Sequence, residues 1–194
     1  MMLQMAKVPF VSLEPVEHDD PLGLSTGAGL IFGATGGVME AALRTGYELA
    51  TGRELPDINL HDVRGLQGLK EAEVNVNGLI LKVAVAHGGA NIRRVMEAID
   101  TGEREYHFVE FMACTGGCLG GGGEPKSLDP LVLEKRIAAI YGNDADMPLR
   151  KSHDNPSVQE LYETFLEQPN SHLAHKMLHT HYTDRSHEVL HYTK

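Results

Sequence analysis

The sequence has very little cysteine, no tryptophan and no long hydrophobic run. Cys114 and Cys118 are the only cysteines in 194 residues, and their C-x3-C spacing cannot form the disulfide framework of a small secreted domain. The first twenty residues lack the apolar run of a signal peptide. The longest nearly uncharged stretch, residues 23–39, contains six glycines and is too short to span a bilayer. We therefore expect a cytoplasmic protein without membrane insertion.

Positive charge is also scarce. Lys and Arg number 17 against 27 Asp and Glu, which gives a formal net charge of −10. Binding to nucleic acid or to anionic lipid depends on Lys and Arg that displace counterions, so the composition disfavours both partners. With 42% hydrophobic and 23% charged residues, the chain has the composition of a globular protein with one substantial core.

Residue patterns up to position 125 predict an α/β architecture. Asn77-Gly78 between two apolar runs is a strong hairpin signal. The second run is almost wholly apolar, which predicts a strand inside a sheet covered on both faces. A strand, a helix and another strand then form a βαβ unit with a parallel pair. The predicted elements are a loop at 19–29, a short apolar step at 30–32, a helix at 38–51 ended by Gly52, strands at 73–76 and 79–85, a helix at 91–100 and a strand at 108–112.

The remaining residues carry helical patterns and no convincing strand. We expect a mixed or parallel sheet with flanking helices, followed by an all-helical C-terminal strap laid over it. His153 is predicted to join this strap to the core. Arg150 and Lys151 could screen the negative charge of a cluster domain, but a solvated pair is the favoured interpretation. The predicted helices of the strap lie at 130–141, 157–167 and 172–179.

A glycine-rich turn, Gly33-Ala34-Thr35-Gly36-Gly37, precedes the first predicted helix. Its N–H groups could cradle an anion at the helix N-terminus. Its spacing, however, matches neither the dinucleotide-binding nor the P-loop pattern. A tight turn where backbone segments pack closely is the interpretation that such a weak pattern favours.

The segment FMACTGGCLGGGGEP at 111–125 carries the most specific chemistry. It places two thiols four residues apart, with glycines between and after them, at the end of a strand predicted to be buried. Thiolates are the usual ligands of iron–sulfur clusters, and glycines let the backbone approach a cluster closely. The spacing alone is equally compatible with two free thiols buried in a glycine-rich loop.

This segment resembles the third cysteine signature of the iron-only ([FeFe]) hydrogenases, MACPGGCxxGGGQP. Thr115 and Glu124 depart from the usual residues, and neither change removes a ligand. The resemblance implies that residues 1–127 are the C-terminal part of the large-subunit catalytic domain and that residues 128–194 are a small-subunit-like helical segment. Four more segments resemble the family in the same order: GAGLIFGATGGVMEAALRTGYEL, VRGLQGLKEA, LRKSHDNPSVQELYETFL and SHLAHKMLHTHYT.

The resemblance also implies roles for four residues. Cys114 would bind the [4Fe–4S] cubane of the H-cluster, and Cys118 would bridge that cubane to the two-iron subcluster. Met112 would pack against the two-iron site, and Phe32 would shield it. The implied activity is the reversible reduction of two protons to hydrogen, with electrons exchanged with ferredoxin or with NAD(P)-linked subunits. A low-potential site of this kind needs thiolates, a dry wall and backbone N–H donors.

The number of cysteines limits this interpretation, because a cubane needs four thiolates and the chain has two. The family's other cysteine signatures, TSCCP-like and PC-x-x-K-like, have no counterpart in residues 1–26. We therefore expect half of an active site, which either needs the N-terminal half of the catalytic domain and hydrogenase maturation factors or is a truncated product. The alternative is a noncatalytic relative that serves iron–sulfur assembly, sensing or partner binding; the small-subunit-like segment counts against it.

Histidines near the C-terminus suggest two further sites. HEVLH at 187–191 fits the zinc-peptidase pattern H-E-x-x-H, but it lacks a third ligand and a following cleft, so a chance match or a solvated helix end is favoured. His172, His175 and His179 share a helical face. They could form a metal patch, although the resemblance supports a packed interface.

Overall fold

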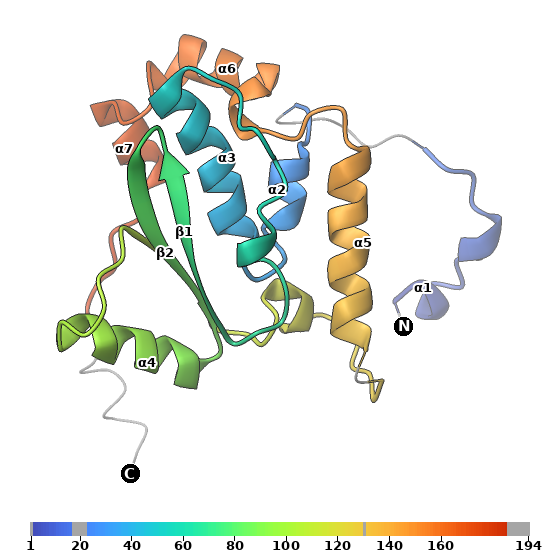
Figure 1. The fold of residues 1–194 in the computed structure, drawn as a ribbon. Coiled ribbons are helices and arrows are strands. Elements are labelled where there is room, and N and C mark those ends of the chain that lie inside the picture. Colours follow the sequence, from blue (N-terminus) through green and yellow to red (C-terminus); the bar gives the residue numbers. More distant parts are fainter. Residues whose placement is uncertain (1, 17–22, 130, 186–194) are drawn as a thin grey trace.

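The computed structural model describes residues 2–16, 23–129 and 131–185 (Figure 1). At its centre is a three-stranded sheet whose strands, in spatial order, are β1 (Leu69–Val76), β2 (Leu79–His87) and β3 (Phe108–Met112). β1 and β2 are antiparallel, and Asn77 and Gly78 between them both have positive φ, as the hairpin signal predicts. β2 and β3 are parallel and are joined through a helix. The predicted α/β fold with a mixed sheet is confirmed.

Helices surround this sheet and form the C-terminal region (Figure 1). No helix among the described residues is long and apolar enough to cross a membrane. The α-helices of the described residues are α1 (Met2–Met5), α2 (Gly27–Ile31), α3 (Gly37–Thr51), α4 (Gly89–Asp100), α5 (Val132–Asp146), α6 (Pro156–Leu161) and α7 (His172–Leu178). Shorter turns are the 3-10 helices η1 (Phe10–Ser12), η2 (His61–Val63), η3 (Cys118–Gly120) and η4 (Ser152–Asp154) and the π-helical η5 (Tyr162–Leu166).

The core lies between β2 and α3. Val83 and Val85 of β2 pack in one cluster with Met39 and Leu43 of α3. Because side chains alternate along a strand, the intervening alanines of β2 point to the opposite face, and they are buried as well. The second half of β2 is therefore covered on both faces, as predicted, whereas the strand is exposed where it begins, at Leu79.

The predicted loop at 19–29 was wrong at its end, because Gly27–Ile31 forms α2. The Thr26 side chain caps this helix by accepting a hydrogen bond from the Gly29 N–H at 3.1 Å. Two buried α2 residues, Ala28 and Ile31, pack in one cluster with Ile140 of α5. Glycine disfavours helix, so it is packing against distant residues that stabilises α2.

The prediction that the strand before the cysteines is buried was also wrong. β3 is the edge strand of the described sheet, and Glu110 is its one buried residue. Phe108 and Phe111 are each 38% exposed. Their apolar character predicts burial, and nothing within the described part of the chain covers them fully.

The C-terminal helices are joined to α3 by hydrogen bonds and ion pairs. His153 contacts Thr45 Oγ1 at 3.1 Å and Glu48 at 2.9 Å, which confirms its predicted role. Lys151 donates to both Glu48 carboxylate oxygens at 3.0 Å, and Arg150 donates to Asp144 at 2.6 Å. The prediction of a solvated pair was therefore wrong, because Lys151 forms an ion pair with Glu48 and Arg150 forms one with Asp144.

One buried ion network lies between α3 and α5. The Arg44 guanidinium, wholly buried, donates to both carboxylate oxygens of Asp144 at 2.8 Å and to Glu40 at 2.7 Å. Arg64 donates to the same Glu40 oxygen at 2.6 Å and to the other oxygen at 2.8 Å. Burial by itself would raise the pKa of Asp144, but hydrogen bonds from Arg44 and Arg150 hold that pKa below its usual value.

Candidate metal centre

The cysteine loop begins directly after β3. Cys114 lies two residues beyond the strand, and Cys118 begins the 3-10 turn η3. Both thiols are free and exposed, so the alternative of two buried thiols was wrong. The structure brings together all four residues singled out in the sequence. Cys114, Cys118, Met112 and Phe32 line one open cavity of about 570 Å³.

The wall of this cavity is largely apolar. Phe32 lies at the C-terminal end of α2, and Met112 is the last residue of β3. Val38 and Phe111 complete the wall. Phe32 remains 47% exposed, so the described residues cover only one side of the space in front of the thiols. The arrangement provides soft ligands beside a hydrophobic surface, which suits a metal cluster with sulfur ligands.

The cysteine loop is attached to the turn that precedes α3. The Thr35 N–H donates to the Gly116 carbonyl at 3.0 Å, and the Leu119 N–H donates to the Gly33 carbonyl at 3.2 Å. Gly117 has φ +93°, and a Cβ there would lie 2.8 Å from the Gly33 carbonyl oxygen. The approach of the two backbones therefore requires glycine at position 117.

The Gly33–Gly37 turn is as tight as predicted, and it also binds an anion. A Cβ on Gly36 would lie 1.9 Å from the Val63 carbonyl oxygen. The anion is the buried carboxylate of Glu110 in β3, which accepts hydrogen bonds from Gly36 N at 2.6 Å and from Met39 N at 2.7 Å. A carboxylate is favourable at a helix N-terminus. This contact fixes α3 to the strand that leads into the cysteines.

A buried lysine supports the same turn. Lys70 of β1 donates to the Gly65 carbonyl at 2.8 Å and to the Thr35 carbonyl at 3.3 Å. Burial lowers the pKa of Lys70 to about 8, against the opposing effect of the Glu110 charge. Lys70, Glu110 and His87 were not predicted as residues of the site. Glu110 and His87 carried a signal, because one interrupts and the other ends an apolar strand pattern, whereas Lys70 lies in a mixed polar segment without such a signal.

The residues present fit part of an iron–sulfur cluster. Two exposed thiols face one cavity, and the glycines after them leave space, since a Cβ on Gly122 or Gly123 would meet nothing within 4 Å. Among the described residues no group of three or more His, Cys, Asp or Glu could hold a metal ion. These residues could therefore supply two of the four thiolates that a cubane needs, and the other two would come from elsewhere.

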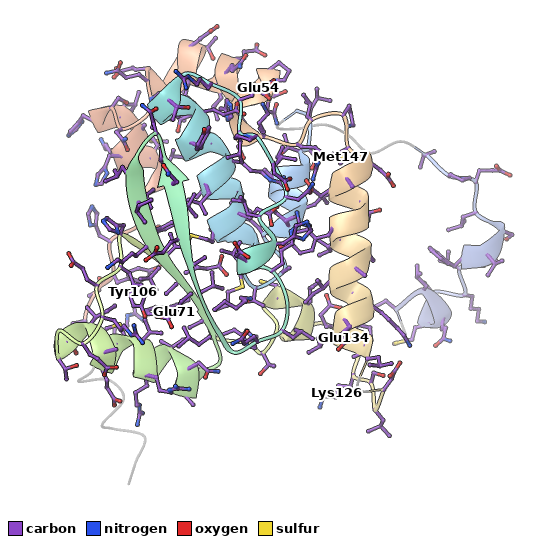
Figure 2. The ribbon with its side chains drawn as sticks, in the orientation of Figure 1. Glu54, Glu71, Tyr106, Lys126, Glu134 and Met147 are labelled. Carbon is purple, nitrogen blue, oxygen red and sulfur yellow. The ribbon has the colours of Figure 1, made fainter. Side chains whose placement is uncertain are left out.

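A second hollow of about 440 Å³ lies between β1 and α4, and neither cysteine lines it. Tyr106 donates a hydrogen bond to Glu71 there (Figure 2). Burial and the Glu71 carboxylate raise the pKa of Tyr106 to about 12. Arg94 and Arg104 also line this hollow. Its charged lining contains no sulfur ligand, so it is not a second half of the metal centre.

The C-terminal histidines form neither of the arrangements weighed for them. His172, His175 and His179 are all exposed, so the packed interface was wrong for the described chain. The rings of His175 and His179 stack with centroids 4.1 Å apart, but no metal group is found among the described residues. The HEVLH pattern at 187–191 lies outside the described residues.

A mixed sheet flanked by helices places this chain among the α/β proteins, and the two-thiol glycine loop at the end of a parallel strand offers ligands of the kind that iron–sulfur clusters use. More specifically, the chain belongs to the iron-only hydrogenase family. Residues 1–122 match the family model "Iron only hydrogenase large subunit, C-terminal domain". Residues 130–185 match the model "Iron hydrogenase small subunit". The resemblance inferred from the motifs is confirmed.

Known relatives are longer than this chain. It is 49% identical over 185 residues to the NADP-reducing hydrogenase subunit HndD of Solidesulfovibrio fructosivorans, covering 95% of this chain and 32% of that protein. It is 48% identical over 156 residues to the periplasmic [Fe] hydrogenase large subunit of Nitratidesulfovibrio vulgaris, covering 74% and 37%. The chain thus spans about a third of the length of these curated relatives.

The chain also matches a solved hydrogenase structure and an iron–sulfur assembly protein. The structure of HydA(deltaEFG), solved in work on stepwise [FeFe]-hydrogenase H-cluster assembly, matches with a TM-score of 0.73 and 40% identity, covering 94% of this chain and 53% of that one. The cytosolic iron-sulfur assembly component 3 of Rattus norvegicus is 32% identical over 153 residues, covering 77% of this chain and 31% of that protein.

Proposed function

We propose that this chain supplies two thiolates and part of the apolar wall of the H-cluster of an iron-only hydrogenase. The bound cluster would supply the redox chemistry that interconverts two protons and two electrons with hydrogen. The observation that carries the proposal is the meeting of Cys114, Cys118, Met112 and Phe32 around one open cavity. These residues come from two segments about 80 positions apart in the sequence.

The chain's own residues would have distinct tasks in this site. Cys114 would ligate the cubane, and Cys118 would ligate it and bridge to the two-iron subcluster. Met112 and Phe32 would exclude water from the two-iron side, since a dry surface strengthens electrostatic interactions near the metals. We also propose a boundary between residues 1–127, as the C-terminal part of the large-subunit catalytic domain, and residues 128–194, as the small-subunit-like segment.

The missing half of the site defines the partner. An N-terminal half of the catalytic domain, in the same polypeptide or in a separate chain, would supply the two further thiolates. The partly exposed Phe108 and Phe111 of β3 and the open side of the cavity support such a partner, because exposed aromatic surface next to a site favours an interface. Hydrogenase maturation factors would be needed for assembly of the cluster.

Electrons would be exchanged with ferredoxin or with NAD(P)-linked subunits in an anaerobic cytoplasm. Support for the nicotinamide route comes from the relative HndD, which is named an NADP-reducing hydrogenase subunit. Two exposed, unpaired thiols support a reducing compartment. The periplasmic relative makes the compartment worth measuring directly, by fractionation of cells that produce the chain.

Co-production tests the proposed function. The full chain is produced with an N-terminal half bearing the other two cysteine signatures and with the maturation factors, and bound iron and hydrogen turnover are measured. We expect both in the wild type, and we expect Cys114→Ser and Cys118→Ser to lose iron and turnover. Glu124→Gln, which introduces the residue usual in the family, is the matched control and should retain both. Unchanged iron in the serine variants, or full loading without the partner, would refute the proposal.

A noncatalytic role in iron–sulfur assembly is the alternative, and the likeness to cytosolic iron-sulfur assembly component 3 favours it. That relative aligns with 77% of the chain, whereas the hydrogenase subunit HndD aligns with 95%. The same co-production experiment separates the two functions. An assembly protein would bind iron and show no hydrogen turnover with any complementing half.

A further inference from the structure

We propose that His87 is a positioning residue that sets the Cys114–Cys118 loop through the backbone N–H of Gly116. The proposal rests on the proposed function of the two cysteines as cluster ligands. His87 is the last residue of β2 and does not line the thiol cavity. It would therefore act through the loop backbone and not by touching the cluster.

The imidazole of His87 is held rigidly on its own strand. Its side chain is buried, with the residue only 4% exposed. The His87 N–H donates to the Gly68 carbonyl at 3.0 Å, and its carbonyl accepts from Asn91 Nδ2 at 2.9 Å. Because the His87 backbone is hydrogen-bonded through both its N–H and its carbonyl, the ring has a fixed position from which to contact the cysteine loop.

Two contacts define the protonation of the ring. Nδ1 lies 3.2 Å from the Gly116 nitrogen, and Nε2 lies 3.1 Å from the Leu66 carbonyl oxygen. A backbone N–H can only donate and a carbonyl oxygen can only accept. Both contacts are therefore hydrogen bonds in a single form of the ring, the neutral tautomer with its proton on Nε2. In this form His87 bridges the segment before β1 to the cysteine loop.

Gly116 is the point of the loop where this bond has most effect, because it lies midway between the two cysteines. It is buried and has φ +80°, which glycine adopts without strain. Its carbonyl accepts from the Thr35 N–H at 3.0 Å, while its own N–H donates to His87. The two peptide groups of Gly116 are thus held by two separate elements, His87 of β2 and the turn before α3. Their orientation would in turn set the orientation of the Cys114 and Cys118 side chains.

Two substitutions at His87 distinguish the role of Nδ1 from that of Nε2. In His87→Asn, the side-chain oxygen can take the place of Nδ1 and still accept from Gly116, but the bond to Leu66 is lost. In His87→Gln, the side-chain amide can reach the place of Nε2 and donate to Leu66, but the Gly116 N–H loses its acceptor. His107→Gln is the matched control, because His107 Nδ1 also accepts a backbone N–H, from Lys82 at 3.0 Å, away from the cysteines.

Hydrogen exchange of the Gly116 amide in the full chain is the first measurement. Because a buried donor without an acceptor is costly, we expect exchange about 5- to 30-fold faster in His87→Gln. His87→Asn should stay near the wild-type rate, and His107→Gln should leave Gly116 unchanged. Equal rates in His87→Gln and the wild type would overturn the proposal. So would unfolding of both His87 variants, because that result indicates a general structural role.

Titration with Cd²⁺ alone, followed by thiolate-to-metal absorbance, is the second measurement. A soft cation binds thiolates, so its affinity reports how well the two sulfurs are oriented. We expect the affinity to fall in His87→Gln and to be retained in His87→Asn and His107→Gln. Equal losses in both His87 variants would overturn the proposal. Failure of the wild type to take up iron with its complementing half would instead refute the proposed function and leave the exchange result standing.

Discussion

Replacing Arg44 with alanine tests whether the two parts of the chain fold as one unit. Arg44 and Glu40 belong to α3, whereas Asp144 belongs to α5 and Arg150 to the segment that follows it. Arg44 is wholly buried and bonds both carboxylates, and it also donates to the Ile58 carbonyl at 3.0 Å. Its removal would leave two buried carboxylates with fewer partners.

The size of the effect follows from the partners that remain. Removing one member of a buried ion pair destabilises a protein by about 3–5 kcal/mol. Asp144 keeps Arg150 at 2.6 Å and Glu40 keeps Arg64 at 2.6 Å. We therefore expect the lower end of that range, a loss of about 3 kcal/mol in the free energy of unfolding. This is a large part of the stability of an ordinary domain.

Urea unfolding followed by circular dichroism measures this loss. Lys135→Ala is the control, because the pair between Lys135 and Asp129 lies at the surface, and such pairs contribute about 0–1 kcal/mol. The double variant Arg44→Ala/Asp144→Ala should lose less than the sum of its single variants, since the two residues share one interaction. A loss in Arg44→Ala no larger than that of the control, or additive single variants, would refute the reasoning.

Two further predictions concern residues that support or belong to the cysteine loop. Burial lowers the pKa of Lys70 to about 8 from 10.5, so between these pH values the unfolded chain binds more protons than the folded one, and the free energy of unfolding should rise with pH. Lys70→Met should remove this contribution to the pH slope, as measured by urea unfolding at a series of pH values. An unchanged slope in the variant would contradict the prediction. Gly117→Ala should destabilise the loop by about 1–3 kcal/mol and reduce iron uptake, because its Cβ would meet the Gly33 carbonyl at φ +93°. Gly122→Ala, with open space around it, should do neither.

Local signals in the sequence were enough for most of the elements. Asn77-Gly78 marks the hairpin, Gly52 ends α3 in a left-handed conformation, and the apolar run after the hairpin becomes the central strand. Each signal acts within a few residues, through turn geometry or side-chain periodicity. α2 was missed because its glycines disfavour helix locally, and its stability comes from contacts with α5.

The candidate metal centre was likewise predictable in part from local signals and in part not. The contiguous motif around Cys114 and Cys118 identifies the thiols and, through the family resemblance, Met112 and Phe32. The roles assigned to these four residues remain predictions, although the structure places them around one cavity. The thiols are exposed, and β3, which leads into them, is the edge strand of the described sheet; no local pattern reveals either fact.

By itself, the sequence determined the family, the order of most elements and the two candidate thiol ligands, because these depend on residue types at short and fixed spacings. Only the tertiary structure decided which buried polar groups hold the site together. Glu110 reaches the N-terminus of α3, and His87 reaches Gly116. These partners lie 74 and 29 residues apart in the chain. A buried polar group must find a hydrogen-bond partner, but the fold alone brings that partner within reach.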